Sequence, residues 1–314
     1  MKREEPYVEI ERSIIKQFRK TIWRPFVRGL QEYRMVQNGD RIAVCISGGK
    51  DSMLLAKCMQ QLKRQSDTDF SLEFLVMDPG YHPANRAMIE ENAARMRVPI
   101  RILESDIFDA VVDAGQSPCY LCARMRRGFL YANARKLGCN KIALGHHFDD
   151  VIETILMGML YGGQINTMMP KLRSTNFPGM ELIRPLYFVK EEDILAWKEH
   201  NGLRFLQCAC RFTEQIAREQ IAREQAAREQ AAGERETGDQ AAGDPAASSG
   251  LQGFGADIVH TSKRQEMKEL IRQLRKNSPF IDANIMKSVE NINLDACLGY
   301  VHRGVRHHFM DEYA

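Results

Sequence analysis

Apolar and polar positions divide the chain into stretches of different periodicity. From Arg41 onward, short apolar runs alternate with helix-length amphipathic segments. Runs of this kind are typical of strands buried on both faces of a parallel sheet. They occupy 41–47, 72–78, 99–105 and 141–147, with helices predicted at about 51–63, 83–96, 122–137 and 149–161. The alternation predicts an α/β fold with a doubly wound parallel sheet, flanked by an N-terminal helix and by C-terminal helices. Ligands are then expected at the carboxyl ends of the strands.

The segment 7–24 has apolar residues four positions apart, with basic residues on its other faces. This spacing predicts an amphipathic helix that packs on the main domain or on a partner subunit and ends at Pro25. RNA contact is the less favoured interpretation of its basic residues. Further along, IRPLYF at 183–188 predicts an additional strand and 190–200 another helix.

Composition changes sharply at 213–250, where the five-residue unit A-R-E-Q-[IA] repeats and then drifts into Gly, Ala, Asp and Ser. Five residues match neither period of an amphipathic helix, so this region predicts a solvated helix followed by a linker. We expect four segments: an N-terminal helical region (1–38), the α/β domain (39–211), the insert (212–256) and a helical C-terminal segment with a basic tail (257–314). The tail's histidines are more typical of an exposed surface than of a metal site.

The formal net charge of the 314 residues is only +3, so any RNA-binding surface has to be a local patch. Eight cysteines and no apolar leader are expected of a protein in the reducing cytoplasm, where paired cysteines serve as metal or redox sites rather than disulfides. No apolar run approaches the roughly 20 residues that span a bilayer, and we expect no membrane association.

The sequence AVCISGGKDSMLL (43–55) places a glycine pair between a predicted strand and a predicted helix. Glycines let backbone N–H groups approach an anion closely, and the helix N-terminus adds partial positive charge. The spacing differs from the G-x-x-x-x-G-K-[ST] of the P-loop, yet a lysine and two serines add a full charge and hydroxyls. These features predict a pyrophosphate-binding loop made of Ser47, Gly48, Gly49, Lys50, Asp51 and Ser52.

Polar residues also follow two other predicted strands. In GHHFDD, Gly145 permits close backbone approach to a nucleotide, and His146 is expected to line the site. Asp149 and Asp150 imply Mg²⁺ binding or proton transfer near phosphates, although one of them is expected to cap the helix. The main chain of Met77, at the end of the second strand, is expected to contact adenosine.

Four cysteines form two close pairs, Cys119 with Cys122 and Cys208 with Cys210. As small apolar residues, they fit an ordinary buried role. Four sulfurs also fit a zinc site, although Cys-x-Cys is tight for two ligands to one metal. A persulfide-forming pair is a further alternative.

Longer motifs occur in an order that resembles a known family. SGGKDS matches the loop of the N-type ATP pyrophosphatases, which cleave ATP between its α and β phosphates. The segments NGDRIAVCISGGKDS, PCYLCARMRRGFLY, KIALGHHFDDVIETILMGMLYGG, MMPKLRS, IRPLYFVKEEDI and LQCAC follow the order of the tRNA 2-thiocytidine synthetase family. The resemblance covers roughly residues 30–210 and, more loosely, 262–300.

The resemblance implies a [4Fe–4S] cluster bound by Cys119, Cys122 and Cys208, with one iron left open for sulfide. The family's last pair is Cys-x-x-Cys, whereas this chain has Cys208-Ala209-Cys210. Cys210 is therefore an alternative third ligand.

The resemblance also implies catalytic residues. Asp150 is the family's acidic position, and Arg126 lies four residues beyond the second cysteine. Asp51, within the loop, is expected to be required for ATP turnover. The implied enzyme uses ATP and Mg²⁺ to adenylate the C2 oxygen of a tRNA cytidine and replaces that oxygen with sulfur, releasing pyrophosphate and AMP.

The expected partners are a tRNA and a sulfide donor such as a cysteine desulfurase. The tRNA is expected to bind through its anticodon loop, where bases are already unstacked. A homodimer is left open. Two other functions also remain open: an ATP-dependent thiolase or amidating enzyme acting on another tRNA base or a small molecule, and a non-catalytic Fe–S redox sensor that binds ATP.

Overall fold

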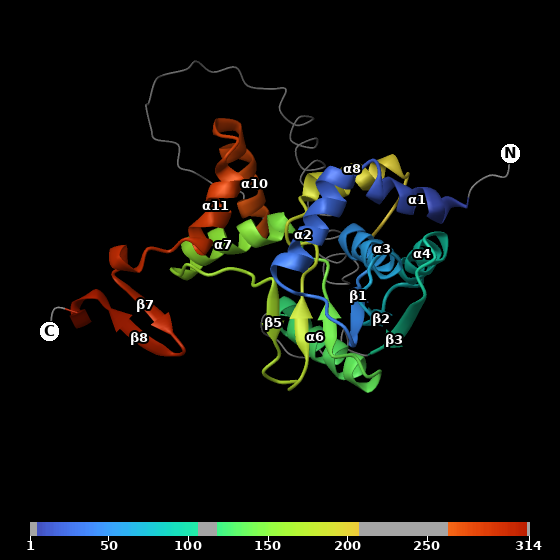
Figure 1. Cartoon of the computed structure of the whole chain (residues 1–314), viewed down its shortest axis with the longest axis horizontal. Coiled ribbons are helices and arrows are strands. Elements are labelled where there is room, and N and C mark those ends of the chain that lie inside the picture. Colours follow the sequence, from blue (N-terminus) through green and yellow to red (C-terminus); the bar gives the residue numbers. More distant parts are fainter. Residues whose placement is uncertain (1–4, 106–117, 207–262, 313–314) are drawn as a thin grey trace, which may run out of the picture. The chain divides into compact units, whose positions relative to one another are not determined.

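The computed structural model describes residues 5–105, 118–206 and 263–312, with the backbone alone at 118–124 and 312. The described residues form two compact units (Figure 1). The first unit comprises those up to His147 and 170–206, and the second comprises 148–169 and 263–312. The five-residue repeat and the pair Cys208 and Cys210 lie outside the described residues.

A six-stranded sheet forms the centre of the first unit (Figure 1). Its strands are β1 (Asp40–Ile46), β2 (Phe70–Asp78), β3 (Ile100–Glu104), β4 (Lys141–Ala143), β5 (Lys171–Arg173) and β6 (Glu181–Ile183). The order is β3-β2-β1-β4-β6-β5, and every pairing is parallel except the edge pair of β5 with β6. The doubly wound parallel sheet is confirmed. Its strand order reverses between β1 and β4, where such sheets bind ligands.

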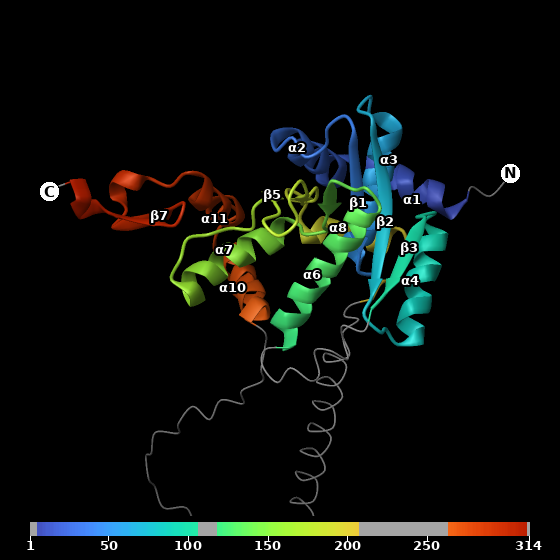
Figure 2. The ribbon, with the colours of Figure 1, turned by 90° about the horizontal axis from the view of Figure 1, so that it is seen from below.

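The side chains of β1 alternate between two apolar cores, because successive strand residues point to opposite faces of a sheet. Ile42, Val44 and Ile46 pack with α3 in the larger core, while Ala43 and Cys45 pack with α6 in the smaller one. Figure 2 shows these layers. The helices of this unit are α1 (Pro6–Ile15), α2 (Arg24–Glu32), α3 (Lys50–Gln65), α4 (Pro83–Arg95), α6 (Pro118–Lys136) and α8 (Glu191–His200).

The N-terminal segment packs as expected, but the single helix predicted over 7–24 was wrong. α1 ends at Ile15, and a π-helical segment follows at Arg19–Trp23. Ile10, Ile14 and Ile22 are buried in the larger core, and the basic residues Lys16, Arg19, Lys20 and Arg24 are exposed. Pro25 lies in the first turn of α2 instead of ending a helix. Proline is tolerated there because a first-turn N–H has no intrahelical acceptor to lose.

Two strand predictions also differ from the structure. The strand expected at 183–188 lies at Glu181–Ile183, and a turn follows in which Tyr187 N donates to Arg184 O at 3.1 Å. Pro185 has no N–H to donate to a sheet ladder. β4 ends at Ala143, so the residues of GHH form a loop after the strand instead of its end.

The second unit contains α7 (Phe148–Gly162), α10 (Lys263–Asn277), α11 (Ile281–Glu290), two 3₁₀ turns (Leu294–Ala296 and Phe309–Glu312) and a hairpin of β7 (Gly299–His302) with β8 (Val305–His308). The helices follow the sequence prediction, whereas the hairpin was not predicted. None of the helices in the described ranges combines the length and the apolar character needed to cross a membrane.

Candidate functional site

The turn between β1 and α3 depends on the absence of a side chain at Gly48. Its φ is +84°, and an added Cβ would lie 2.7 Å from Ile89 Cγ1 and 3.0 Å from Leu206 Cδ1. Gly49 is the N-cap of α3 and brings no capping side chain. The first-turn N–H groups of α3 therefore point toward a position where an anion can bind.

Two serines hold this turn in shape. Ser52 Oγ donates to Gly49 O at 3.0 Å and accepts from Ser47 N at 3.2 Å. The two hydroxyl oxygens are 3.2 Å apart. Ser52 is buried and fixes the backbone, while Ser47 is exposed and is the serine that a bound phosphate can reach.

Lys50 supplies the positive charge of the loop. Its Nζ lies 3.1 Å from Asp51 Oδ1 and 3.0 Å from Glu191 Oε1 at the start of α8. Burial acts to lower the pKa of Lys50, but the charges of Asp51 and Glu191 outweigh it, and the pKa is raised. Lys50 is therefore a cation at neutral pH, ready to exchange a carboxylate for a phosphate. Sequence reasoning missed Glu191, which the chain places 141 residues from Lys50.

Asp51 has the chemistry of a Mg²⁺ ligand. Its Oδ1 is buried and, apart from the ion pair with Lys50, accepts no hydrogen bond from the described residues. His147 Nε2 lies 3.8 Å from the same oxygen. Mg²⁺ in nucleotide sites commonly takes one or two carboxylates and completes its shell with phosphate oxygens and water, so one such oxygen beside a phosphate loop fits the ion. Through Asp51, His147 therefore contacts the loop. The HH pair that follows β4 is the sequence feature that points to it.

Gly145 packs directly against the loop. A Cβ there would lie 2.9 Å from Ser52 N and 3.0 Å from Asp51 C, so glycine is required for the chain after β4 to meet the first turn of α3. Met77 is buried and lies one residue beyond the last β1–β2 pair, Ile46 with Val76, at the carboxyl edge of the sheet. Gly145 follows β4 and Met77 lies at the end of β2, and these two strands flank β1 in the sheet.

Asp149 and Asp150 are described with the second unit, in the first turn of α7. Asp149 Oδ1 accepts a hydrogen bond from Arg275 Nη2 at 2.6 Å, and Asp150 Oδ1 accepts one from Arg264 Nη1 at 2.7 Å. Both arginines belong to α10. Burial acts to lower the pKa of Arg275, but Asp282 and Asp149 outweigh it and raise the pKa.

The remaining predicted residues lie on α6 or outside the described residues. Cys119 and Cys122 are in the first turns of α6, where the backbone alone is described, and half-buried Arg126 follows one turn later. Within the described residues, no group of three or more histidine, cysteine or acidic side chains is arranged to hold a metal ion.

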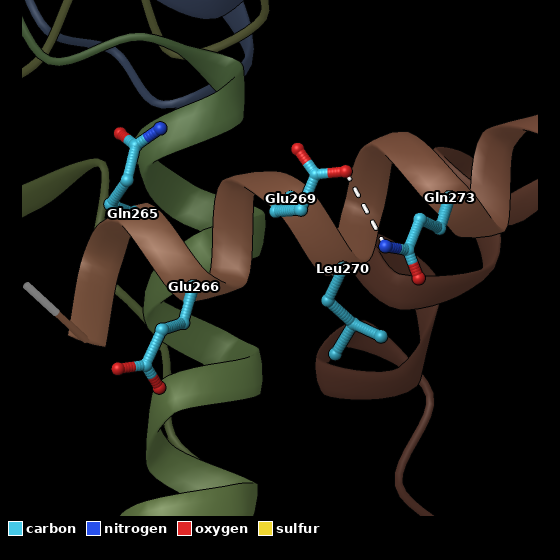
Figure 3. Close-up of a pocket in the computed structure, with 5 residues that line it drawn as sticks. All are labelled: Gln265, Glu266, Glu269, Leu270 and Gln273. Carbon is cyan, nitrogen blue, oxygen red and sulfur yellow. Dashed lines mark hydrogen bonds between the residues drawn. The ribbon is translucent and has the colours of Figure 1, made fainter. Parts of the chain in front are cut away.

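A surface pocket on α10 has a different character (Figure 3). It is lined by Gln265, Glu266, Glu269, Leu270 and Gln273, and Gln273 Nε2 donates to Glu269 Oε1 at 3.4 Å. Its carboxylates repel phosphate. The glycine turn after β1 is the better nucleotide site.

Fold and site together define a class: an α/β domain that binds nucleotide phosphate at a glycine turn where its sheet order reverses. The PP-loop domain family matches residues 14–228. The chain belongs to the PP-loop family and, within it, to the tRNA 2-thiocytidine synthetase family that its motifs resemble.

Two relatives carry the name tRNA-cytidine(32) 2-sulfurtransferase. The one from Alkalilimnicola ehrlichii is 39% identical over 57% of this chain and 58% of its own length. The one from Anaeromyxobacter dehalogenans is 37% identical over 62% of this chain and 68% of its own length. The chain thus spans less than two thirds of the first relative.

Among solved structures, the U34-tRNA thiolase NcsA from Methanococcus maripaludis, with its [4Fe-4S] cluster, has a similar fold. The TM-score is 0.56 at 18% identity, over 86% of this chain and 79% of that one. The likeness supports the architecture described above.

Proposed function

We propose that the chain is an ATP-dependent tRNA sulfurtransferase that converts a cytidine to 2-thiocytidine. The observation that carries the proposal is the SGGKDS turn, built as a phosphate site with Lys50 and Asp51 at the N-terminus of α3. The relatives' printed name supplies the substrate class.

In the first step, the loop binds the β and γ phosphates of ATP through backbone N–H groups, with Lys50 as their counter-charge. The C2 oxygen of the base attacks the α-phosphorus, the bond between Pα and its bridging oxygen breaks, and pyrophosphate leaves. Negative charge that develops on the leaving group is stabilised by donors already in place. Asp51 is our candidate ligand for the Mg²⁺ that accompanies ATP. Gly145 and the main chain of Met77 are proposed to border the nucleotide.

In the second step, hydrosulfide forms a bond to C2 while the bond from C2 to the adenylated oxygen breaks. AMP leaves with the former base oxygen, and the S–H proton passes to a base. Asp150 is our candidate for that proton transfer, and Arg126 for charge stabilisation on the departing AMP. Asp150 has to exchange its hydrogen bond with Arg264 before it can act.

We propose Cys119, Cys122 and Cys208 as the ligands of a [4Fe–4S] cluster, with Cys210 as the alternative to Cys208. When bound, the cluster would supply an iron site that holds sulfide. Replacing Cys208 with alanine should remove the cluster's absorbance, whereas the Cys210→Ala variant should keep it. The reverse result would make Cys210 the third ligand.

The proposed partners are a tRNA anticodon loop and a sulfide donor such as a cysteine desulfurase, and we place the reaction in the cytoplasm. A homodimer is compatible with the proposal.

The test is an anaerobic reaction of the holoprotein with ATP, Mg²⁺, sulfide and unmodified tRNA, followed by nucleoside mass analysis. The proposal expects 2-thiocytidine in an amount equal to the AMP released. Detection of thiolated uridine instead of 2-thiocytidine would show that the enzyme acts on another base. Cluster-containing protein that produces no thiolated nucleoside and no AMP would contradict the proposal.

A further inference from the structure

The C-terminal hairpin, residues 299–308, forms a two-stranded sheet of its own (Figure 1). Arg303 and Gly304 have φ of +50° and +82°, as the two central residues of a type I′ turn require. The register pairs Tyr300 with His307 and His302 with Val305 on one face, and Val301 with Arg306 on the other. Two strands alone are marginally stable in water, so the ribbon is expected to gain stability from a binding partner.

The ribbon itself carries two arginines and no acidic residue, although Asp295 precedes it and Asp311 and Glu312 follow it. Asp311, just after this stretch, accepts a hydrogen bond from the backbone N–H of His308 at 2.8 Å. A polyanion is the complementary ligand.

One face of the ribbon also carries an aromatic platform. The rings of Tyr300 and His307 are stacked, with centroids 4.7 Å apart and planes inclined by 15°. Tyr300 remains 41% exposed although its ring is already packed against a neighbour. An exposed aromatic ring with an arginine in the adjacent turn is an arrangement on which unpaired bases stack.

We infer that this hairpin binds an unstacked segment of RNA, with a base on the Tyr300–His307 platform and phosphates on Arg303 in the turn and on Arg306 of the opposite face. The choice of RNA over other polyanions rests on the proposed function. A-form duplex RNA does not admit a ribbon into its narrow major groove, so the ligand is a loop or single strand.

A second copy of this chain is a weaker candidate for the same surface. Val301 and Val305 are exposed and would favour protein contact, but a two-fold interface places the same patch on both sides. Arginines and histidines would then face their own copies, which is unfavourable without acidic partners.

The test uses full-length holoprotein and a fluorescein-labelled anticodon stem-loop RNA, with the dissociation constant measured by anisotropy across a salt series. Tyr300→Ala should weaken binding about tenfold or more, as for loss of one stacked base. Arg306→Gln should weaken it and reduce the slope of log K against log salt by about one. Tyr300→Phe retains the ring and should bind as the wild type does. Arg173→Gln removes a comparably exposed arginine from β5 and should leave affinity unchanged.

Wild-type affinity in both Tyr300→Ala and Arg306→Gln would overturn the inference while leaving the proposed function intact. Failure of the wild-type holoprotein to bind the RNA would overturn both. Sedimentation velocity tests whether the hairpin serves self-association instead. A dimer that dissociates on Tyr300→Ala, with RNA affinity unchanged, would assign the hairpin to self-association and contradict RNA binding.

Discussion

The first turns of α3 and α7 both carry candidate catalytic aspartates, and the surroundings of these aspartates differ. Asp51, on α3 of the first unit, forms an ion pair with Lys50 of its own loop, although its buried Oδ1 accepts no hydrogen bond from the described residues. Asp149 and Asp150, on α7 of the second unit, accept hydrogen bonds at 2.6 and 2.7 Å from Arg275 and Arg264. The same residue type near a helix start is paired with a cation of the phosphate loop in one unit and with arginines of α10 in the other.

The difference separates roles that sequence reasoning had grouped together. Lys50 is shared between Asp51 and Glu191, so a phosphate that attracts Lys50 leaves the buried Oδ1 of Asp51 to be satisfied by Mg²⁺. Asp149 and Asp150 are instead paired with arginines of α10. Asp51 is therefore the stronger candidate for the metal, and any catalytic action of Asp150 requires Arg264 to release it.

The largest expected effect comes from removing the Asp51 carboxylate. Asp51→Ala should lower the rate of tRNA-dependent pyrophosphate release on the order of 100-fold or more, because several kcal/mol of metal-assisted stabilisation are lost. Asp67→Ala, at an exposed acidic residue beyond the end of α3, is the matched control and should have no effect. A small loss in Asp51→Ala would show that Asp51 does not hold the metal.

Next in size is a change at the contact between Gly145 and α3. Gly145→Ala places a Cβ 2.9 Å from Ser52 N, so the loop has to shift. We expect a loss of about 1–3 kcal/mol in unfolding free energy and weaker ATP binding by calorimetry. Gly128→Ala is the control, since no described atom lies within 4 Å of its added methyl group. Unchanged ATP binding in Gly145→Ala would mean that the loop tolerates displacement.

A smaller effect tests the ion pairs of the second unit. Arg275 Nε also donates to Asp282 Oδ1 at 2.8 Å, so Arg275→Gln removes the cation from two buried carboxylates. Because Arg275 is partly exposed, we expect about 1–2 kcal/mol lower unfolding free energy in urea. Arg272→Gln, on the same helix but more exposed, should change it by less than about 0.5 kcal/mol. Equal effects would argue against a structural role for Asp149.

The smallest effect is expected at Arg264. The Arg264–Asp150 pair is more exposed than the Arg275–Asp149 pair, so Arg264→Gln should lower the unfolding free energy by less than about 1 kcal/mol. If Arg264 competes for Asp150, the rate of 2-thiocytidine formation should rise about two- to threefold in Arg264→Gln, measured by nucleoside mass analysis. A fall in that rate would indicate that Arg264 assists the reaction instead.

Much of the fold follows from the apolar pattern, because β1 and the second half of β2 are buried and have near-continuous apolar sequences. The apolar pattern did not predict elements that lie at the edge of a sheet or are exposed on both faces. β5 is a short edge strand of three residues, and the C-terminal hairpin exposes both faces, so neither has an apolar signature. At Pro25, a helix start was taken for a helix end, since proline fits both.

The site was predicted less completely than the fold. The residues of the glycine loop lie together in sequence, and the structure joins them in one turn. Glu191 and His147 reach Asp51 and Lys50 only through the packing of α8 and of the segment after β4. Asp150 shows the limit of motif reasoning, because its arginine partner is 114 residues away on α10.

The most direct measurement is the fate of labelled ATP. The holoprotein is incubated with tRNA, sulfide and ATP carrying ³²P at the α or γ position, and the products are separated by chromatography. If the glycine loop holds the leaving pyrophosphate, the γ label appears in pyrophosphate and the α label in AMP, in equal amounts. Labelled orthophosphate together with ADP would contradict cleavage between the α and β phosphates, and with it the role assigned to the loop.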